Sequence, residues 1–118
     1  MGMTKSVFGK TSNGEVVHLV TVSNQKGMSI EVLDYGATLL SVNVPDKDGH
    51  TEDVALGYDD VLDYEKGDAY LGATVGRCGN RVDHADFSIN GKEYFMEKNE
   101  GENVCHSGPR CYSRRMWD

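Results

Sequence analysis

The chain has 118 residues, 38% of them hydrophobic, and a formal net charge of −7 at pH 7. This length fits one domain, and the excess of acidic residues argues against non-specific binding to nucleic acid or to an anionic membrane. No stretch approaches the ~18 apolar residues that span a bilayer, and the first residues lack the apolar region of a secretion signal. The three cysteines, Cys78, Cys105 and Cys111, indicate free thiols in a reducing compartment. We therefore expect a cytoplasmic protein without membrane or nucleic-acid partners.

Alternation of residue types predicts β-strands in the first half of the chain. Val16–Ser23 is rich in β-branched residues and has turn residues on both sides, which is typical of a strand. The alternation continues over Met28–Val32 and again over Leu40–Val44, with an interruption at Tyr35–Thr38. Asp46–Gly49 then predicts a turn that ends on glycine.

One short helical turn is predicted over residues 59–64, with Asp59 as its N-cap. No longer helical pattern, internal repeat or linker is present in the chain. The sequence therefore predicts a single all-β unit of short antiparallel strands, in the class of sandwiches and barrels. A sheet that ends on an unpaired strand leaves backbone N–H and C=O groups without hydrogen-bond partners, and we expect such an edge here.

The clearest hairpin lies at Asp86–Met96. Its centre, Asn90-Gly91, has the two residues that favour the positive φ angles of a type I′ turn. In the register of that turn, Phe87 lies opposite Tyr94 on one face of the hairpin. We therefore expect an aromatic pair at this position.

Polar residues on turns rich in glycine are the candidates for a binding site. Asn80 and Arg81 follow the segment Gly72–Gly79, and His106 stands just before Ser107-Gly108. Amide, guanidinium and imidazole groups form directional hydrogen bonds with hydroxyl oxygens. The pattern is therefore better matched to a neutral polyhydroxylated ligand than to a phosphate or a metal.

Each candidate also has a purely structural interpretation. Asn80 can serve as a turn residue, and Arg81 can pair with Asp83 or Asp86 on the surface. His106 can hydrogen-bond its own loop. The residues alone leave both interpretations open.

Metal and phosphate sites are disfavoured by spacing. Gly76-x-x-Gly79 lacks the lysine and hydroxyl residue that complete a phosphate-binding loop. The cysteines with His106 lack the Cys-x-x-Cys pairs of a structural zinc site. We expect no metal and no cofactor, and we interpret His18, His50 and His84 as structural or solvated.

Six short segments occur in a fixed order along the chain. They are Tyr35–Leu39, Val54–Tyr58, Gly72–Arg77, Asn80–Val82, Asn90–Tyr94 and His106–Gly108. Their order and spacing resemble the aldose 1-epimerases, also called galactose mutarotases, from about Ser6 to Asp118. The resemblance implies a galactose-mutarotase-like antiparallel β-sandwich, truncated so that residues 1–118 form the N-terminal part of a single domain.

The resemblance also implies an activity. Enzymes of this family interconvert the α and β anomers of aldohexoses such as galactose and glucose by acid/base ring opening, without a metal or organic cofactor. By motif position, Asn80, Arg81 and His106 would bind the monosaccharide. The family's general acid, a histidine, and its general base, a glutamate, fall beyond Asp118, so no catalytic residue is expected in this chain. We expect the chain to be inactive alone.

Two alternatives stay open at this point. The first is a non-catalytic carbohydrate-binding or regulatory protein of the same fold, and the second is a structural domain unrelated to sugars. Two residues also depart from the family pattern, since Cys105 replaces a leucine and Ser107 replaces a glycine. If the backbone at Ser107 requires a positive φ, serine costs about 1 kcal/mol or more there and affects the placement of His106.

Overall fold

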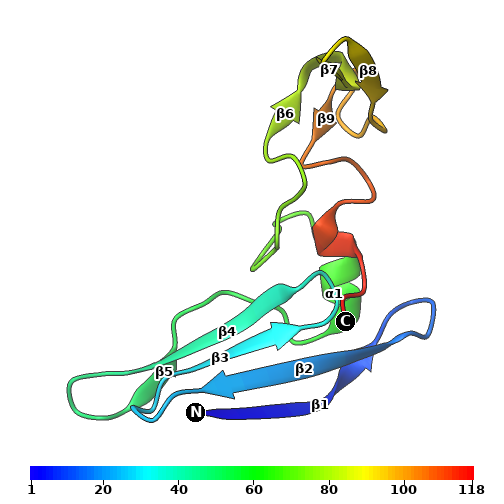
Figure 1. Cartoon of the computed structure of the whole chain (residues 1–118). Coiled ribbons are helices and arrows are strands. Elements are labelled where there is room, and N and C mark those ends of the chain that lie inside the picture. Colours follow the sequence, from blue (N-terminus) through cyan, green and yellow to red (C-terminus); the bar gives the residue numbers. More distant parts are fainter.

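The computed structural model describes all residues, 1–118, and shows a large sheet and a smaller hairpin region joined by loops (Figure 1). Five strands form the large sheet in the order β1-β2-β3-β4-β5, and each pairs antiparallel with its sequence neighbour. The bounds are β1 Gly2–Lys10, β2 Val16–Ser23, β3 Ser29–Leu33, β4 Thr38–Pro45 and β5 Thr51–Asp53. The all-β prediction is confirmed, and so is the turn at Asp46–Gly49, where the Gly49 N–H donates to the Asp46 carbonyl at 3.2 Å.

The hairpin region contains two short ladders, β6 with β9 and β7 with β8. Its elements are β6 Arg81–Val82, the 3₁₀ turn η1 Asp83–Ala85, β7 Asp86–Ile89, β8 Lys92–Phe95 and β9 Val104–Cys105. Phe87 lies opposite Tyr94, and their rings stack with centroids 5.3 Å apart. Asn90 and Gly91 both have positive φ, as the type I′ turn requires. The predicted hairpin and its aromatic pair are therefore confirmed.

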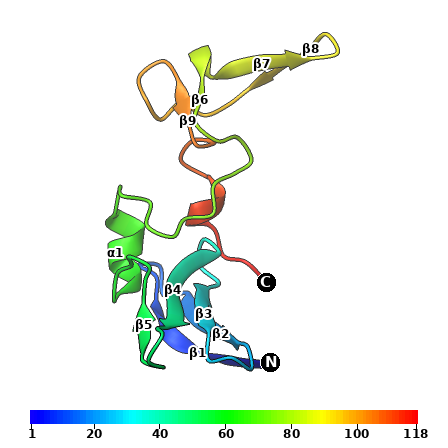
Figure 2. The same cartoon turned by 90° about the vertical axis from the view of Figure 1, so that its left-hand side faces the viewer.

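A small core forms where helix α1 (Val61–Lys66) packs on one face of the large sheet (Figure 2). Val17, Leu33 and Val61 are 0%, 1% and 2% exposed, so this contact excludes water almost completely. Only 13 of the 118 residues are buried in the whole chain. The core is therefore small for a chain of this length.

The helix begins later than the sequence predicted. Its N-cap is Asp60, which has an extended backbone and accepts a hydrogen bond from the Leu62 N–H at 2.7 Å. The prediction of Asp59 was wrong by one residue, because two adjacent aspartates offer the same cap chemistry and only the chain path selects one. No helix in the chain is long and apolar enough to cross a membrane.

The two faces of the large sheet differ in what covers them. One face carries α1 and a polar patch in which the Ser41 hydroxyl donates to Glu31 at 2.8 Å. The register places Val20 beside Val32 and Val22 beside Ile30 on the opposite face. Figure 2 shows no helix or strand on that side. We call it the open face; besides Lys5 and His18, which both contact Asp34, it carries Met3, Val7, Val20, Val22, Ile30, Val32 and Val42.

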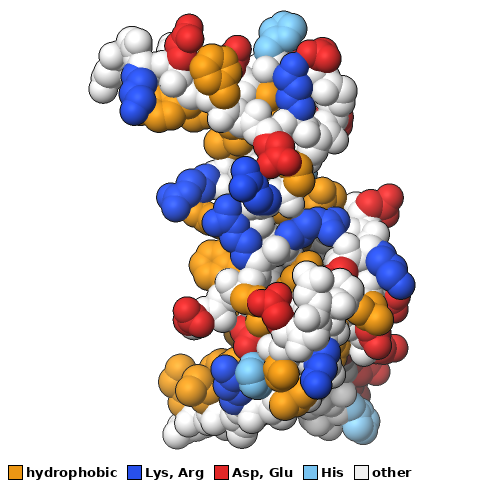
Figure 3. All heavy atoms as spheres, turned by 90° about the vertical axis from the view of Figure 1, so that its right-hand side faces the viewer, with side chains coloured by type: hydrophobic (Ala, Val, Ile, Leu, Met, Phe, Trp, Pro, Cys, Tyr) orange, Lys and Arg blue, Asp and Glu red, His pale blue; other side chains and the backbone are white.

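The chain returns to the large sheet after the hairpin region. A short 3₁₀ turn, η2 (Tyr112–Arg114), precedes residues 115–117, and the Trp117 N–H donates to the Asp34 carbonyl at 2.8 Å. Basic side chains gather between the two regions (Figure 3). The guanidinium groups of Arg77 and Arg115 each lie 5.6 Å from the centre of the Tyr112 ring in η2.

Candidate functional site

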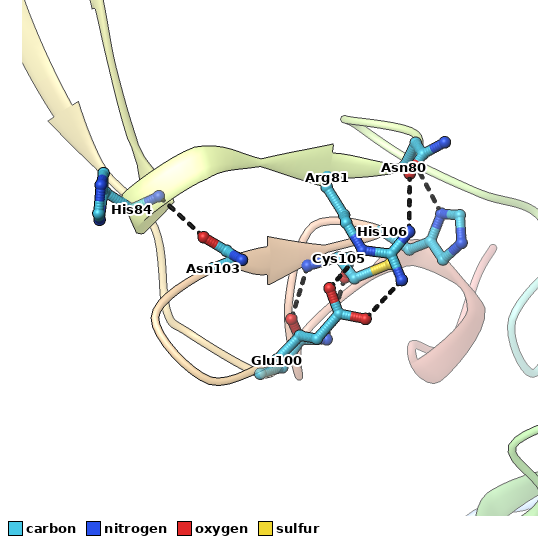
Figure 4. A network of polar contacts seen from close by, with 8 residues as sticks. Asn80, Arg81, His84, Glu100, Asn103, Cys105 and His106 are labelled. Atoms are coloured by element: carbon cyan, nitrogen blue, oxygen red, sulfur yellow. Dashed lines mark hydrogen bonds and ion pairs between the residues drawn. The ribbon is translucent and has the colours of Figure 1, made fainter.

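The pairing of β6 with β9 brings the predicted site residues together (Figure 4). Arg81 lies opposite Cys105, so Asn80 and His106 become neighbours although they are far apart in the sequence. The His106 N–H donates to the Asn80 carbonyl at 2.9 Å, and the Asn80 N–H donates to His106 Nδ1 at 3.0 Å. Asn80, Arg81 and His106 therefore form one cluster at the end of a short ladder.

The second of these bonds decides which nitrogen of His106 carries a proton. A backbone N–H can only donate, so Nδ1 must accept and is unprotonated in this arrangement. The neutral imidazole then carries its hydrogen on Nε2, which makes no hydrogen bond within the chain. The half-buried His106 thus offers a donor from Nε2 to a ligand.

Arg81 is held by a carboxylate that the sequence analysis did not single out. Its Nε and Nη2 donate to the two carboxylate oxygens of Glu100 at 2.5 and 2.6 Å. Nη1 donates to Asn80 Oδ1 at 3.3 Å. The predicted ion-pair partners Asp83 and Asp86 were wrong, because the loop after β8 places Glu100 against the guanidinium.

The Arg81–Glu100 pair shifts both groups toward their charged forms. The hydrogen bonds from Arg81 lower the pKa of the Glu100 carboxyl, with a further contribution from its positive charge. The same hydrogen bonds raise the pKa of the Arg81 guanidinium. Glu100 is therefore ionised, and both of its carboxylate oxygens accept hydrogen bonds from Arg81. It is not free to take a proton from a ligand.

The bend after His106 requires unusual backbone angles. His106 has φ 51° and Ser107 has φ 72°. Ser107 therefore has the positive φ at which a serine is strained and a glycine is not. The Ser107 hydroxyl, however, accepts from the Cys78 N–H at 2.7 Å and donates to the Cys78 carbonyl at 3.0 Å. Ser107 therefore ties the bend to the loop that precedes Asn80, an interaction that glycine cannot provide.

Tyr70 was missed by sequence reasoning. Its ring centre lies 5.7 Å from that of His106, and the residue is 41% exposed. Tyr70 also has a positive φ of 53°, which is uncommon for an aromatic residue. A tyrosine at the start of the glycine-rich segment carries no signal in sequence that it will reach a histidine so far along the chain.

The other histidines lie in separate places. His18 on β2 contacts Asp34 at 2.7 Å through Nδ1, and His50 lies 3.4 Å from Asp46 in its turn. The His84 N–H donates to Asn103 Oδ1 at 3.1 Å, near the far end of the β6–β9 ladder (Figure 4). No three His, Cys, Asp or Glu side chains are grouped to hold a metal ion, and all three cysteines are free.

Comparison with known proteins supplies the family. The family model described as aldose 1-epimerase matches residues 18–118. The chain belongs to the aldose 1-epimerase family. It is 33% identical to the galactose mutarotase of Sus scrofa over 99% of the chain and 34% of that protein. It is also 33% identical to the aldose 1-epimerase of Escherichia coli K12, over 89% of the chain and 30% of that enzyme.

Solved structures support the same assignment. The galactose 1-epimerase from Lactobacillus acidophilus NCFM superimposes with a TM-score of 0.79 and 30% identity, covering 100% of this chain and 33% of that one. An aldose epimerase homologue from C. elegans gives a TM-score of 0.76 and 36% identity, covering 85% and 31%. The predicted galactose-mutarotase-like fold is confirmed. The chain spans about a third of the length of the relatives it matches, and it corresponds to their N-terminal portion.

Proposed function

We propose that Asn80, Arg81 and His106 form part of a monosaccharide-binding site, and that the aldose 1-epimerase site to which they belong interconverts the α and β anomers of aldohexoses such as galactose and glucose. The observation that carries the proposal is the Asn80–His106 hydrogen-bond pair. It leaves the donor of the neutral imidazole on Nε2, which has no hydrogen-bond partner within the chain, while the Arg81 guanidinium lies against Asn80 Oδ1 in the same cluster. Nε2 of His106 and the two Arg81 N–H groups not used by Glu100 and Asn80 can donate to hydroxyl oxygens of a sugar ring.

The reaction needs groups that this cluster does not offer. A base must take the proton of the C1 hydroxyl and an acid must protonate the ring oxygen, after which the C1–O5 bond opens and closes on the other face. Such positioned proton transfers contribute about 10²–10⁴-fold each. Glu100 is bound by Arg81, and His106 in its neutral form is a donor at Nε2. In our proposal the cluster binds and orients the sugar, and the acid and base come from elsewhere in the site.

Binding is tested by NMR titration of the chain with galactose, and then with glucose. We expect the resonances of Asn80, Arg81 and His106 to shift, while those of His50, an exposed histidine in a distant turn, stay in place as an internal control. A His106→Ala variant should lose the response at Asn80. A titration in which none of the three site residues moves would contradict the proposal.

Catalysis is tested by polarimetry of freshly dissolved α-D-galactose. We expect the 118-residue chain to bind sugar without accelerating mutarotation. Acceleration that disappears in His106→Ala would show that the acid and base lie within these residues, and our division of roles would be wrong. Sugar binding that never supports catalysis, even with the remaining part of a relative added, would favour the non-catalytic carbohydrate-binding alternative.

A further inference from the structure

The carboxylate of Glu100 lies inside the candidate site, although no sequence motif pointed to it. Glu100 belongs to the loop between β8 and β9, and its side chain reaches the guanidinium of Arg81 with both oxygens (Figure 4). The loop is closed by its own backbone, since the Asn103 N–H donates to the Glu100 carbonyl at 2.9 Å and the Glu100 N–H donates back at 3.2 Å. This turn therefore holds the carboxylate against Arg81.

Glu100 occupies the edge of Arg81 that recognises anions best. Nε and Nη2 form the fork on which a guanidinium binds a carboxylate or a phosphate with two parallel hydrogen bonds. Both of these nitrogens donate to Glu100, at 2.5 and 2.6 Å. An anionic ligand cannot use this fork unless it displaces the Glu100 carboxylate.

The donors that Arg81 keeps for a ligand lie close to the same negative charge. Of its five N–H groups, Glu100 takes two and Asn80 takes one, so that one remains on Nη1 and one on Nη2. A ligand oxygen bound to Nη2 lies about 5 Å from the nearer Glu100 oxygen, and one bound to Nη1 lies within about 8 Å. A hydroxyl oxygen tolerates this neighbour, whereas a carboxylate or phosphate oxygen is repelled by it.

Glu100 is ionised and is the acidic side chain in direct contact with the cluster. Hydrogen bonds from Arg81 are the main cause of its lowered pKa, and the charges of Arg81 and His106 lower the pKa further. The next carboxylate of the loop, Glu102, is paired with Lys98 at 2.5 Å instead. No other carboxylate forms a hydrogen bond or an ion pair with Arg81. The repulsion of an anion at this site therefore comes mainly from one residue.

We propose that Glu100 determines the charge specificity of the site: it restricts binding to uncharged monosaccharides and excludes sugars that carry a carboxylate or a phosphate. The proposal rests on the proposed function, because it concerns the sugar that Asn80, Arg81 and His106 would bind. Without Glu100, an exposed arginine with a free fork would favour anionic sugars. Paired with Glu100, Arg81 has no net charge to offer and serves as a donor to hydroxyl oxygens.

The test compares D-galactose with D-galacturonate, in which a carboxylate replaces the hydroxymethyl group at C6. NMR titration of the chain, at pH 7 and about 20 mM salt where charges are weakly screened, gives a dissociation constant for each sugar from the resonances of Asn80 and His106. The quantity compared is the ratio of the two constants, because a general weakening of the site cancels in it. In the unchanged chain we expect galacturonate to bind about tenfold more weakly than galactose.

Two glutamates of the same loop give a matched pair of variants. Glu100→Gln keeps the shape of the side chain and removes its charge, so the ratio should fall about tenfold. Glu102→Gln removes the same charge from beside Lys98, and the ratio should change by less than about twofold. The two glutamate side chains are 41% and 77% exposed, so neither change should unfold the chain. A ratio that is unchanged in Glu100→Gln, or that falls equally in both variants, would overturn the proposal.

Salt separates an effect of charge from an effect of shape. At about 0.5 M salt the interaction between exposed charges is largely screened over the distances involved. The ratio in the unchanged chain should then approach the ratio in Glu100→Gln. Discrimination that persists at high salt would show that Glu100 excludes galacturonate by its shape, and the role proposed for its charge would be wrong.

The outcomes also separate this proposal from the proposed function. Galactose binding together with a ratio that does not respond to Glu100→Gln overturns the role of Glu100 and leaves the sugar site standing. No response to either sugar in any of the proteins contradicts the sugar site, and the role of Glu100 fails with it. Binding of galacturonate by Glu100→Gln alone, with no binding of galactose, supports the role of Glu100 and contradicts galactose as the ligand.

Discussion

Gly72 lies directly against Leu39 and joins the large sheet to the glycine-rich loop that leads to Asn80. The Leu39 N–H donates to the Gly72 carbonyl at 2.9 Å, and Gly72 has a positive φ of 60°. A Cβ at this position would overlap the carbonyl of Leu39. The approach of these two backbones therefore sets where the loop leaves the sheet, and with it the place of the candidate site.

We expect Gly72→Ala to destabilise the chain by about 2–4 kcal/mol, because it adds both a backbone clash and a strained φ. Gly14→Ala is the matched control: Gly14 also has a positive φ, of 84°, but no atom lies within 4 Å of its added Cβ. That control should cost only about 1 kcal/mol. Thermal and urea unfolding measure both changes. Equal losses in the two variants would mean that the Leu39 contact contributes nothing.

The Asn80–His106 pair predicts a fixed histidine tautomer. Nitrogen NMR of the neutral imidazole should show Nδ1 unprotonated and Nε2 protonated. Asn80→Gly keeps the backbone N–H and tolerates the positive φ of 59°, so the tautomer should be unchanged. Asn80→Val is disfavoured at that φ and should lose about 1–3 kcal/mol of stability. A neutral His106 with its proton on Nδ1 would refute the bond.

The Arg81–Glu100 pair predicts a pH dependence. Because hydrogen bonds from Arg81 hold the folded pKa of Glu100 below its ordinary value of 4.5, the pair contributes stability above that value and loses it as the pH falls through the folded pKa. Carbon NMR titration should show the Glu100 pKa rising toward its ordinary value in Arg81→Met. The lowered pKa of Asp46, caused first by the backbone N–H of His50, should not move in that variant. A Glu100 pKa that is the same in Arg81→Met as in the unchanged chain would contradict the pairing.

The hydrogen bonds and the positive φ of Ser107 predict an order of stability for serine, alanine and glycine at this position. Ser107→Ala loses both hydrogen bonds to Cys78 and keeps the strained φ, so we expect a loss of about 1–2 kcal/mol. Ser107→Gly loses the same bonds but relieves the backbone, so its cost should be smaller by about 1 kcal/mol. Chemical denaturation of the three proteins gives the order directly. A glycine variant less stable than the alanine variant would show that backbone strain at φ 72° is unimportant.

Local patterns predicted much of the fold correctly. The strand at Val16–Ser23 and the Phe87–Tyr94 hairpin follow from period-two alternation and from turn residues, which act over a few neighbouring positions. Strand β1, Gly2–Lys10, was not predicted, because its residues alternate weakly. Its conformation comes from pairing with β2 across the turn at residues 11–15, which the pattern within β1 alone does not reveal.

The candidate site, like the fold, was predicted only where residue type and local motifs carry the information. Residue type and motif order singled out Asn80, Arg81 and His106, and the structure places the three side by side; their role in binding a sugar stays a prediction. Glu100 and Tyr70 were missed, since each reaches the site only through the path of a loop. No short-range pattern connects a carboxylate or a ring to a partner that lies many residues away.

The sequence by itself determined the strand-rich class, the turns and the donor groups available for a ligand, because propensity and side-chain chemistry are local properties. The tertiary structure alone decided that Asp60 caps the helix, that Glu100 binds Arg81, and that the Asn80 N–H occupies Nδ1 of His106. It also decided that one face of the large sheet, on which Lys5 and His18 meet Asp34 among valines and isoleucine, carries no helix. Those outcomes depend on which distant backbones pair, and pairing is fixed by packing of the whole chain.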